Sequence, residues 1–250
     1  MNGTPGPQRR FAVMFPRLLC LLALFSVSAL AQQVTLPLPR LLTIMPMGGQ
    51  AGQNVEVTIT GENIEDVTEL TFSSPKITAK PVAGATSKFT VSIAADAPVG
   101  VYDARVMSRL GVSSVRVFSV GKLTEVVRTK ANNTLETALP LPLGTICNAT
   151  MTKRAVDFYS FQGVKGQAVA IDCAAVGIDS RLTPVLILAD GKGADLKVNR
   201  TGGMIDFTPP ADGTYIIKVS DLTYQGGERH FYRLALQKSP AEPQPQTQTV

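Results

Sequence analysis

Apolar and polar residues alternate along most of this chain after about residue 40. Apolar side chains hold one parity in several runs, among them Val55-Glu-Val-Thr-Ile59 and Phe89-Thr-Val-Ser-Ile93. Alternation with a period of two predicts half-buried antiparallel strands. Glycine and proline end the runs at short intervals, as at Gly61 and at Pro98-Val-Gly100. The pattern therefore predicts an all-β chain whose short strands pack as sandwiches.

The second half of the chain carries the same alternation. We expect strands over residues 145–151, 157–161, 167–174, 184–190, 195–198, 204–207, 214–220 and 229–236. Loop-forming residues gather at Ala131-Asn-Asn-Thr134 and Pro140-Leu-Pro142, which predicts a linker over 121–142. This organisation places one unit at 41–120 and a second unit at 143–238.

The N-terminal residues have the pattern of a secretory signal peptide. Arginines precede an apolar run over 18–30, and Ala29-Leu-Ala31 fits the small-residue rule for cleavage between Ala31 and Gln32. The alternative is a membrane anchor, but the run is shorter than the roughly 20 residues of a spanning helix. A signal peptide at 1–31 predicts export to the periplasm, the cell surface or the medium, with no transmembrane segment after cleavage.

Removal of the signal peptide changes the charge of the chain. It takes three of the 24 basic residues and none of the 19 acidic ones, so the net charge falls from +5 to about +2. The remaining chain has no basic run interleaved with aromatic residues, which argues against a nucleic-acid interface. The tail at 239–250 is rich in Pro, Gln and Thr, and this composition predicts disorder.

Two cysteines, Cys147 and Cys173, remain after the signal peptide and its Cys20 are removed. An even pair in an exported chain predicts a disulfide. The alternative is two buried free thiols, because cysteine is a common core residue. Metal ligation is disfavoured, since a lone and distant pair lacks the spacing of a zinc site.

Catalytic chemistry has few candidates in this chain. A Ser-His-Asp or Cys-His arrangement needs a histidine base, and the one histidine, His230, stands at the start of the last predicted strand. A carboxylate pair for glycoside hydrolysis stays an open alternative, because the chain has enough Asp and Glu residues to supply one. The chain has no Trp to stack on a sugar. We therefore expect a protein that is not an enzyme.

Five motifs follow one another in the second half. They are Asp157-Phe-Tyr-Ser-Phe161, Gly166-Gln-Ala-Val169, Ser180-Arg-Leu-Thr-Pro-Val-Leu186, Pro209-Pro-Ala-Asp212-Gly213-Thr-Tyr215 and Phe231-Tyr-Arg-Leu234. Their succession resembles the bacterial pre-peptidase C-terminal domain, a non-catalytic β-sandwich appended to secreted enzymes and envelope proteins. The resemblance implies a jelly-roll-like sandwich, in which Asp212 serves as the hydrogen-bonding residue of a turn between two strands.

The first half resembles a second family. The motifs are Val57-Thr-Ile-Thr-Gly-Glu-Asn-Ile64, an apolar strand over 67–72, and Ala97-Pro-Val-Gly-Val-Tyr102. They are similar to those of immunoglobulin-like domains of the TIG type. The two resemblances together imply an all-β fold of two antiparallel β-sandwich domains after a signal peptide, the first immunoglobulin-like and the second jelly-roll-like.

One departure from the pre-peptidase pattern bears on cofactors. Many relatives carry an Asn-Asp-Asp cluster where this chain has Asn199-Arg-Thr201. Calcium needs about 6–8 oxygen ligands, several of them charged, so the missing carboxylates argue against a calcium site. We interpret the nearby Asp190, Asp195 and Asp206 as solvated turn residues and predict no cofactor, with calcium as the open alternative.

Export and two interaction-type domains lead to a functional hypothesis. We expect a non-enzymatic binding or spacer protein of the bacterial cell envelope, whose partner is an unknown protein or polysaccharide. One alternative is a carbohydrate or matrix-adhesion module with a binding face formed by Tyr224, His230, Phe231 and Tyr232, unless alternate members of this group are core residues. The other is an accessory subunit of a separate secreted peptidase.

Overall fold

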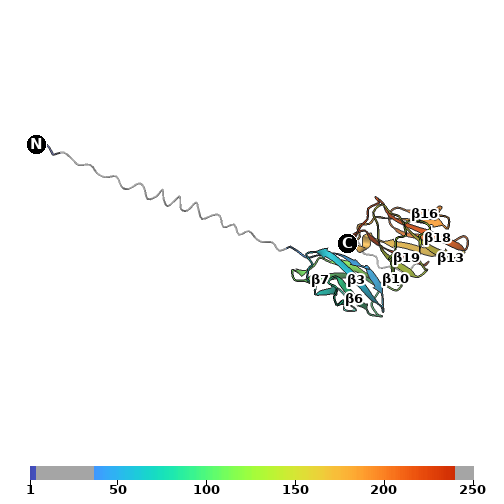
Figure 1. Ribbon diagram of the computed structural model, residues 1–250, viewed down its shortest axis with the longest axis horizontal. Helices are drawn as coiled ribbons and strands as arrows, with labels where there is room; N and C mark the ends of the chain where they lie inside the picture. The colour runs from blue at the N-terminus through green and yellow to red at the C-terminus, as the bar shows by residue number, and fades with distance from the viewer. Residues whose placement is uncertain (4–36, 240–250) are drawn as a thin grey trace. The chain divides into compact units, whose positions relative to one another are not determined.

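The computed structural model describes residues 1–3 and 37–239 of the 250-residue chain. Residues 37–239 belong to one compact unit, and their regular structure is almost entirely strand (Figure 1). The one helical element in the described residues is the short 3-10 helix η1 (Val176–Ile178). The predicted all-β fold class is confirmed.

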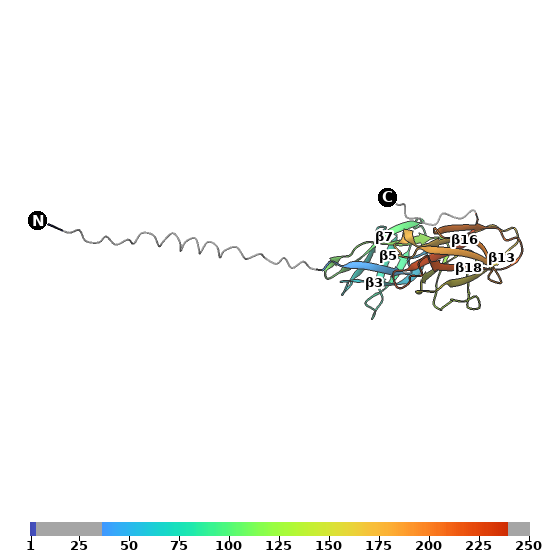
Figure 2. The ribbon, with the colours of Figure 1, turned by 90° about the horizontal axis from the view of Figure 1, so that it is seen from above.

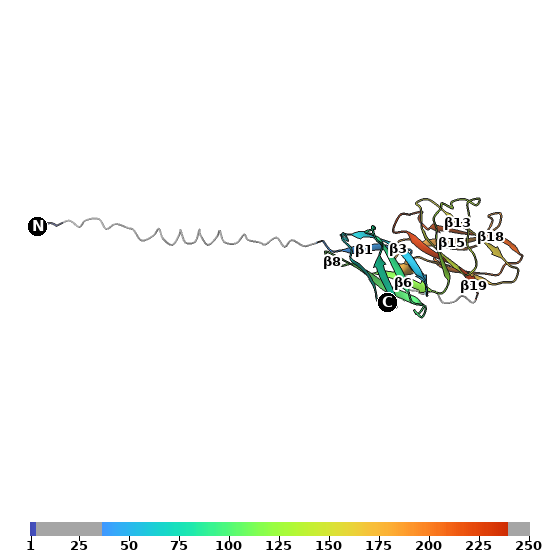
Figure 3. The ribbon, with the colours of Figure 1, turned by 60° about the horizontal axis from the view of Figure 1, so that its bottom comes forward.

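The first half forms two sheets. Sheet A has the spatial order β1 (Arg40–Met45), β3 (Asn54–Glu62), β6 (Lys88–Ile93) and β5 (Ile77–Pro81). Sheet B has the order β2 (Gly48–Gln50), β9 (Arg116–Gly121), β7 (Gly100–Ser108) and β4 (Glu69–Phe72), with β8 (Gly111–Val112) paired to β7. Figure 3 shows β1, β3 and β6 of sheet A side by side. We call this pair of sheets the first sandwich.

The alternating pattern explains how the first sandwich forms. In β6, Phe89 and Val91 are buried while Thr90 between them is partly exposed. Phe118 and Val120 of β9, in the opposite sheet B, are also buried and pack in the same core. Burial of each such side chain contributes roughly 1.5–3 kcal/mol, which fixes the register because a slip by one residue would expose the whole apolar set.

The second half forms two further sheets. Sheet C has the order β10 (Thr124–Val127), β12 (Thr145–Thr150), β19 (Phe231–Lys238), β14 (Val169–Ala174) and β17 (Gly203–Phe207). Sheet D has the order β11 (Leu139–Pro140), β13 (Asp157–Gly163), β18 (Gly213–Asp221), β15 (Pro184–Asp190) and β16 (Asp195–Asn199). Figure 2 shows β13 and β18 of sheet D as neighbours. We call this pair the second sandwich, and its core includes Tyr159, Ile171 and Leu234.

The segment predicted as a linker also contributes strands. Within 121–142, β10 pairs in parallel with β12 and β11 pairs in parallel with β13, so both ends of the segment are edge strands of the second sandwich. β2 and β9 are a further parallel pair, in the first sandwich. The sandwiches are therefore antiparallel with parallel edge pairings, and the domain division at 41–120 and 143–238 stays a prediction.

The two sandwiches share a buried junction inside the compact unit. Ile178 of η1 and Phe231 of β19 are fully buried and belong to the core of the first sandwich, although their own strands and loops are part of the second. The amide of Val117 in β9 donates a hydrogen bond to Oδ2 of Asp179, at 3.2 Å. The outer face of sheet C is thus partly a packing face.

Candidate functional site

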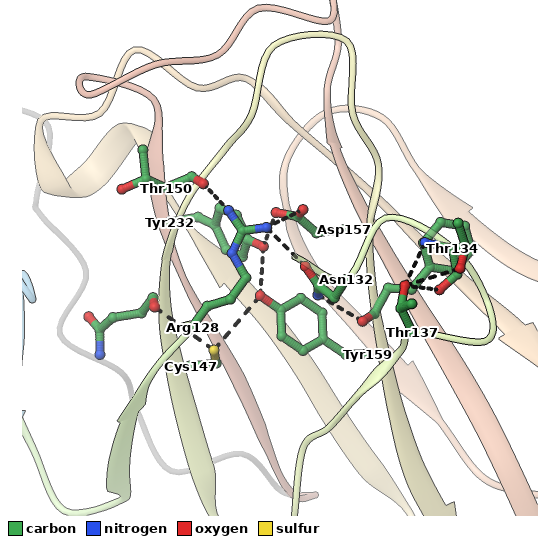
Figure 4. Close-up of polar contacts among 11 residues, drawn as sticks. Arg128, Asn132, Thr134, Thr137, Cys147, Thr150, Asp157, Tyr159 and Tyr232 are labelled. Atoms are coloured by element: carbon green, nitrogen blue, oxygen red, sulfur yellow. Dashed lines mark hydrogen bonds and ion pairs between the residues drawn. The ribbon is translucent and has the colours of Figure 1, made fainter. Parts of the chain in front are cut away.

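A group of buried polar and titratable side chains lies inside the second sandwich (Figure 4). The Arg128 guanidinium lies 2.5 Å from Oδ1 of Asp157, and it also donates to Oδ1 of Asn132 at 2.9 Å. It donates in addition to the backbone carbonyl of Thr150. Asp157 has no exposed side-chain surface, and the Arg128 side chain is 10% exposed. We call these residues, with Tyr232, Tyr159 and Cys147, the buried polar network.

Local structure explains how the network is assembled. Arg128 directly follows the edge strand β10, and its amide donates to the carbonyl of Asn148 at 2.9 Å. Asn132 exchanges two hydrogen bonds of 2.8 Å with the backbone of Phe158 in β13, one through its side-chain amide and one through its carbonyl. The segment between β10 and β11 is therefore held on sheet D at the residue next to Asp157.

The tyrosines continue the network toward the cysteine. The Tyr232 hydroxyl donates to Oδ2 of Asp157 at 2.6 Å, which leaves the Tyr159 hydroxyl to donate to Tyr232 at 2.7 Å. The Cys147 thiol lies 3.8 Å from the Tyr159 oxygen. Figure 4 shows this contact as the last link of the chain of polar groups. The hydroxyls and the thiol thus point one after another toward a single carboxylate.

Burial sets the protonation of these groups. Burial raises the pKa of Asp157, although the Tyr232 hydroxyl and the Arg128 guanidinium act in the opposite direction. Burial also raises the pKa of Tyr159 and Tyr232 well above the usual tyrosine range. The pKa of the Cys147 thiol is raised for the same reason, so it is a poor nucleophile. The network is suited to hold the segment between β10 and β11 in place, and its geometry offers no activated group.

A second buried ion pair lies at the junction between the sandwiches. The Arg233 guanidinium of β19 pairs with the Glu125 carboxylate of β10, and their side chains are 4% and 10% exposed. Asn148 of β12 donates to the other Glu125 oxygen at 2.5 Å. A Cβ on Gly48 of β2 would lie 2.9 Å from Cζ of Arg233, so the first sandwich packs directly on this guanidinium. We call Glu125, Asn148 and Arg233 the junction cluster.

The predicted disulfide is wrong, because Cys147 and Cys173 are both buried free thiols. Each of them is the register partner of Leu234, Cys147 from β12 and Cys173 from β14, with β19 between them. Two strand spacings amount to about 9–10 Å, whereas a bridge needs Cα atoms within about 7 Å. Both thiols face the core of the second sandwich, and Cys173 shares its strand parity with the buried Val169 and Ile171.

We expect both thiols to be unreactive in the folded protein. Burial raises the pKa of Cys147 and Cys173, which leaves little thiolate to attack an alkylating reagent. Intact mass after brief iodoacetamide treatment should show neither residue labelled in the native protein and both labelled after unfolding without reductant. If the unfolded protein takes up no label and its mass is two hydrogen atoms below that of the dithiol form, the two cysteines form a disulfide.

The predicted aromatic binding face is also wrong. Phe231 and Tyr232 are both about 1% exposed, the first in the core of the first sandwich and the second in that of the second. Tyr224 is 53% exposed on a separate turn, and His230 is partly buried just before β19. Among the described residues, no hydrogen bond joins the His230 imidazole to a serine or a carboxylate.

The family-motif turn has a structural role at an edge between the sheets. Pro209 and Asp212 lie in the connection that leaves sheet C after β17, and Gly213 is the first residue of β18 in sheet D. Oδ1 of Asp212 accepts a hydrogen bond from the amide of Lys165 at 2.6 Å, so it ties this turn to a neighbouring loop. Tyr215 donates to the carbonyl of Ala211 at 2.9 Å. The equivalent bond in the first sandwich joins Tyr102 to Pro98 at 2.6 Å.

Two of the carboxylates considered for calcium have other partners. Oδ1 of Asp190 accepts from the amides of Lys192 and Ala194, at 2.9 Å each. Asp195 pairs with Lys218 at 2.6 Å, and Asp206 is exposed. No group of three His, Cys, Asp or Glu side chains that could hold a metal ion is found in the part of the chain that the structure describes.

The predicted signal-peptide cleavage site, between Ala31 and Gln32, lies outside the described residues, as does nearly all of the predicted tail. No helix within residues 1–3 and 37–239 is long and apolar enough to cross a membrane. Sequence reasoning missed the paired residues of both buried clusters. Arg128 and Glu125 lie in none of the five motifs, whereas Asp157 and Arg233 lie in two of them, which give no sign of their partners. The only signal is a charged residue inside an otherwise apolar strand, as at Arg233.

No family model matches the chain. A curated relative, a probable subtilase-type serine protease of Deinococcus radiodurans, is 34% identical over 97 residues, which cover 36% of this chain and 13% of the protease. This chain thus spans a small part of that relative. Among solved structures, the pre-peptidase C-terminal domain of a Bacillus anthracis collagenase is similar at 15% identity and a TM-score of 0.33, over 40% of this chain and 93% of that chain.

A glucan-complexed structure is also similar. It is the SGBP-B protein of a Bacteroides ovatus mixed-linkage glucan utilization locus, at 12% identity and a TM-score of 0.28, over 77% of this chain and 42% of that chain. Likenesses at these TM-scores carry no argument about function.

Proposed function

We propose that this chain is an exported, non-enzymatic protein of the bacterial cell envelope, which binds other envelope components or holds them at a fixed spacing. In this proposal the second sandwich is a pre-peptidase C-terminal domain and the first is an immunoglobulin-like domain of the TIG type. The motifs that support these assignments lie on the strands and turns of the corresponding sandwich, from Asp157 in β13 to Phe231 in β19.

The buried junction between the sandwiches carries the proposal. Ile178 and Phe231 are packed in the core of the first sandwich, and the Arg233–Glu125 ion pair is buried beside Gly48. Flexible tandem domains usually meet through small and polar interfaces, whereas apolar contacts of this kind fix their relative orientation. A rigid pair of sandwiches is suited to hold other components at a fixed spacing. The titratable groups of the buried polar network pair with one another, which supports a non-enzymatic role.

A second candidate is an accessory subunit that acts on a separate secreted peptidase. The similarity to 97 residues of a probable subtilase-type protease supports this candidate. It shares the non-enzymatic role and differs only in the partner.

Crosslinking in the envelope fraction, followed by purification of the full chain, tests the proposal. We expect a reproducible envelope partner, and a secreted peptidase among the captured proteins would favour the accessory role. The purified protein should also turn over casein and glycan substrates no faster than a His230→Ala variant, which lacks the only histidine. Turnover by the wild type that His230→Ala abolishes would overturn the non-enzymatic assignment.

A further inference from the structure

Four arginines from both sandwiches converge beside the junction. Arg40 opens β1 and Arg116 opens β9 in the first sandwich. Arg181 and Arg229 come from two loops of the second sandwich, after η1 and before β19. We call these four residues the arginine cluster.

Three hydrogen bonds place the members of the arginine cluster side by side. The amide of Arg181 donates to the carbonyl of Arg229 at 2.8 Å, so these two loops are adjacent. The amide of Val117 donates to Asp179 at 3.2 Å, which places residue 116 beside the loop that carries Arg181. The Arg116 side chain donates through Nε to the carbonyl of Leu42 at 3.0 Å and so reaches the strand that begins at Arg40.

Most of the positive charge in the cluster is not neutralised. Arg40 pairs with Glu62 at 2.7 Å, but Arg116, Arg181 and Arg229 form no ion pair among the described residues. The pKa of Arg229 is lowered, first by partial burial and then by the charges of Arg181, Arg116 and Arg40, and Glu62 opposes this only in part. Asp179 and Glu228 are nearby along the chain and pair with none of these guanidiniums.

One guanidinium of the arginine cluster, that of Arg116, is preorganised for an anion. The Arg116 guanidinium is held by the carbonyls of Leu42 and Val115, at 3.0 and 2.9 Å, so it keeps a fixed direction without a charged partner. Arg181 and Arg229 have free guanidiniums within the described part of the chain. A planar guanidinium forms paired hydrogen bonds with a carboxylate, and fixed donors lose little entropy when the anion binds.

We propose that the arginine cluster is a binding site for an acidic polysaccharide, whose carboxylate groups pair with Arg116, Arg181 and Arg229. Double-stranded DNA carries one charge per about 1.7 Å, and single strands are bound by exposed aromatic platforms. Glu62 neutralises Arg40, so the arginine cluster fits a polymer of lower charge density than duplex DNA. The adjacent Phe231 is buried and offers no stacking surface for the bases of a single strand. That the polymer is a polysaccharide rests on the proposed envelope function.

Calorimetric titration of the full chain with polygalacturonate at low ionic strength tests this site. The double variant Arg181→Gln/Arg229→Gln should bind at least roughly tenfold more weakly, because it removes two of the three guanidiniums that pair with the carboxylates. The control is Arg109→Gln with Arg105→Gln, which removes the same charge from exposed positions of the first sandwich and should bind like wild type. Added salt should weaken wild-type binding, since the pairs are solvent-accessible.

The outcomes separate this site from the proposed function. Equal weakening in the control double variant, or no binding of polygalacturonate by the wild type, would overturn the site even if an envelope partner is captured. Tighter binding to duplex DNA or to anionic phospholipid vesicles than to polygalacturonate would overturn the polysaccharide assignment. An unchanged melting temperature in both double variants shows that any loss of binding is local.

Discussion

Replacement of Arg128 by methionine is expected to lower the free energy of unfolding by about 3–5 kcal/mol, because it leaves a buried charge without its partner. Asp157 has no exposed side-chain surface, and its remaining partner is the Tyr232 hydroxyl. Chemical denaturation followed by fluorescence or circular dichroism measures the change. The double variant Arg128→Met/Asp157→Leu should recover a large part of the loss, since it removes both charges.

The pH dependence of this variant supplies an independent readout. Without Arg128, the pKa of Asp157 in the folded state rises further above its unfolded value, because burial already raises it and the opposing charge is gone. A raised folded pKa favours folding below the unfolded pKa and loses that advantage as pH rises through the folded value. The deficit relative to wild type should therefore be smaller near about pH 4 than near about pH 7.

An exposed ion pair gives the matched control. Arg105→Met breaks the pair with Asp103, whose atoms are 3.8 Å apart and whose side chains are about half exposed. Such surface pairs contribute about 0–1 kcal/mol. A loss as small as this for Arg128→Met would show that the buried polar network does not depend on its charge.

Replacement of Arg233 by methionine is expected to have a comparable cost, about 3–5 kcal/mol, by leaving Glu125 nearly buried and unpaired. The substitution also affects Asp172. Burial raises the pKa of this carboxyl, and the Arg233 charge and the Cys173 amide oppose that rise, so loss of the charge makes ionised Asp172 less favourable. Because the guanidinium lies against Gly48, the contact between the sandwiches should loosen as well. Denaturation and hydrogen exchange at β2 and β10 measure the two effects.

Two variants sharpen the second prediction. Arg233→Lys keeps the charge but loses the planar fork, so it should fall between wild type and Arg233→Met. Arg233→Met/Glu125→Leu removes both charges and should regain stability. If Arg233→Met reduces the protection against hydrogen exchange in β19 but not in β2, the role of Arg233 at the junction is contradicted.

Much of the fold could be predicted from alternation alone. The strand expected over 184–190 forms as Pro184–Asp190, and those expected over 145–151 and 195–198 form as Thr145–Thr150 and Asp195–Asn199. Period-two patterns succeed where one face of a strand is apolar and the other is not, as in β6, in which Phe89, Val91 and Ile93 are buried and the residues between them are not. Strand β15 is instead a nearly continuous apolar run that is buried on both faces, and its length and bounding residues predict a strand. The short parallel strands β10 and β11 have no such pattern, which is why their segment reads as a linker.

The errors about the site share a physical cause. Strand β19 is buried on both faces, since Phe231 faces the first sandwich and Tyr232 faces the second. The prediction of an aromatic binding surface assumed that one face of this strand is exposed to solvent. The register that places Leu234 between the two cysteines depends on strand order, which a single sequence does not reveal. The ion pairs join residues 29 and 108 positions apart, beyond the reach of any local pattern.

The double burial of β19 has a consequence for how this protein can be divided. A fragment containing only the second sandwich would present Phe231, Ile178 and the Arg233 guanidinium to water, and so would be prone to association. The complementary fragment would lose part of its own interior. Transfer of either half into another protein would therefore require redesign of this face, and gene rearrangements that keep the pair together should be better tolerated than those that split it.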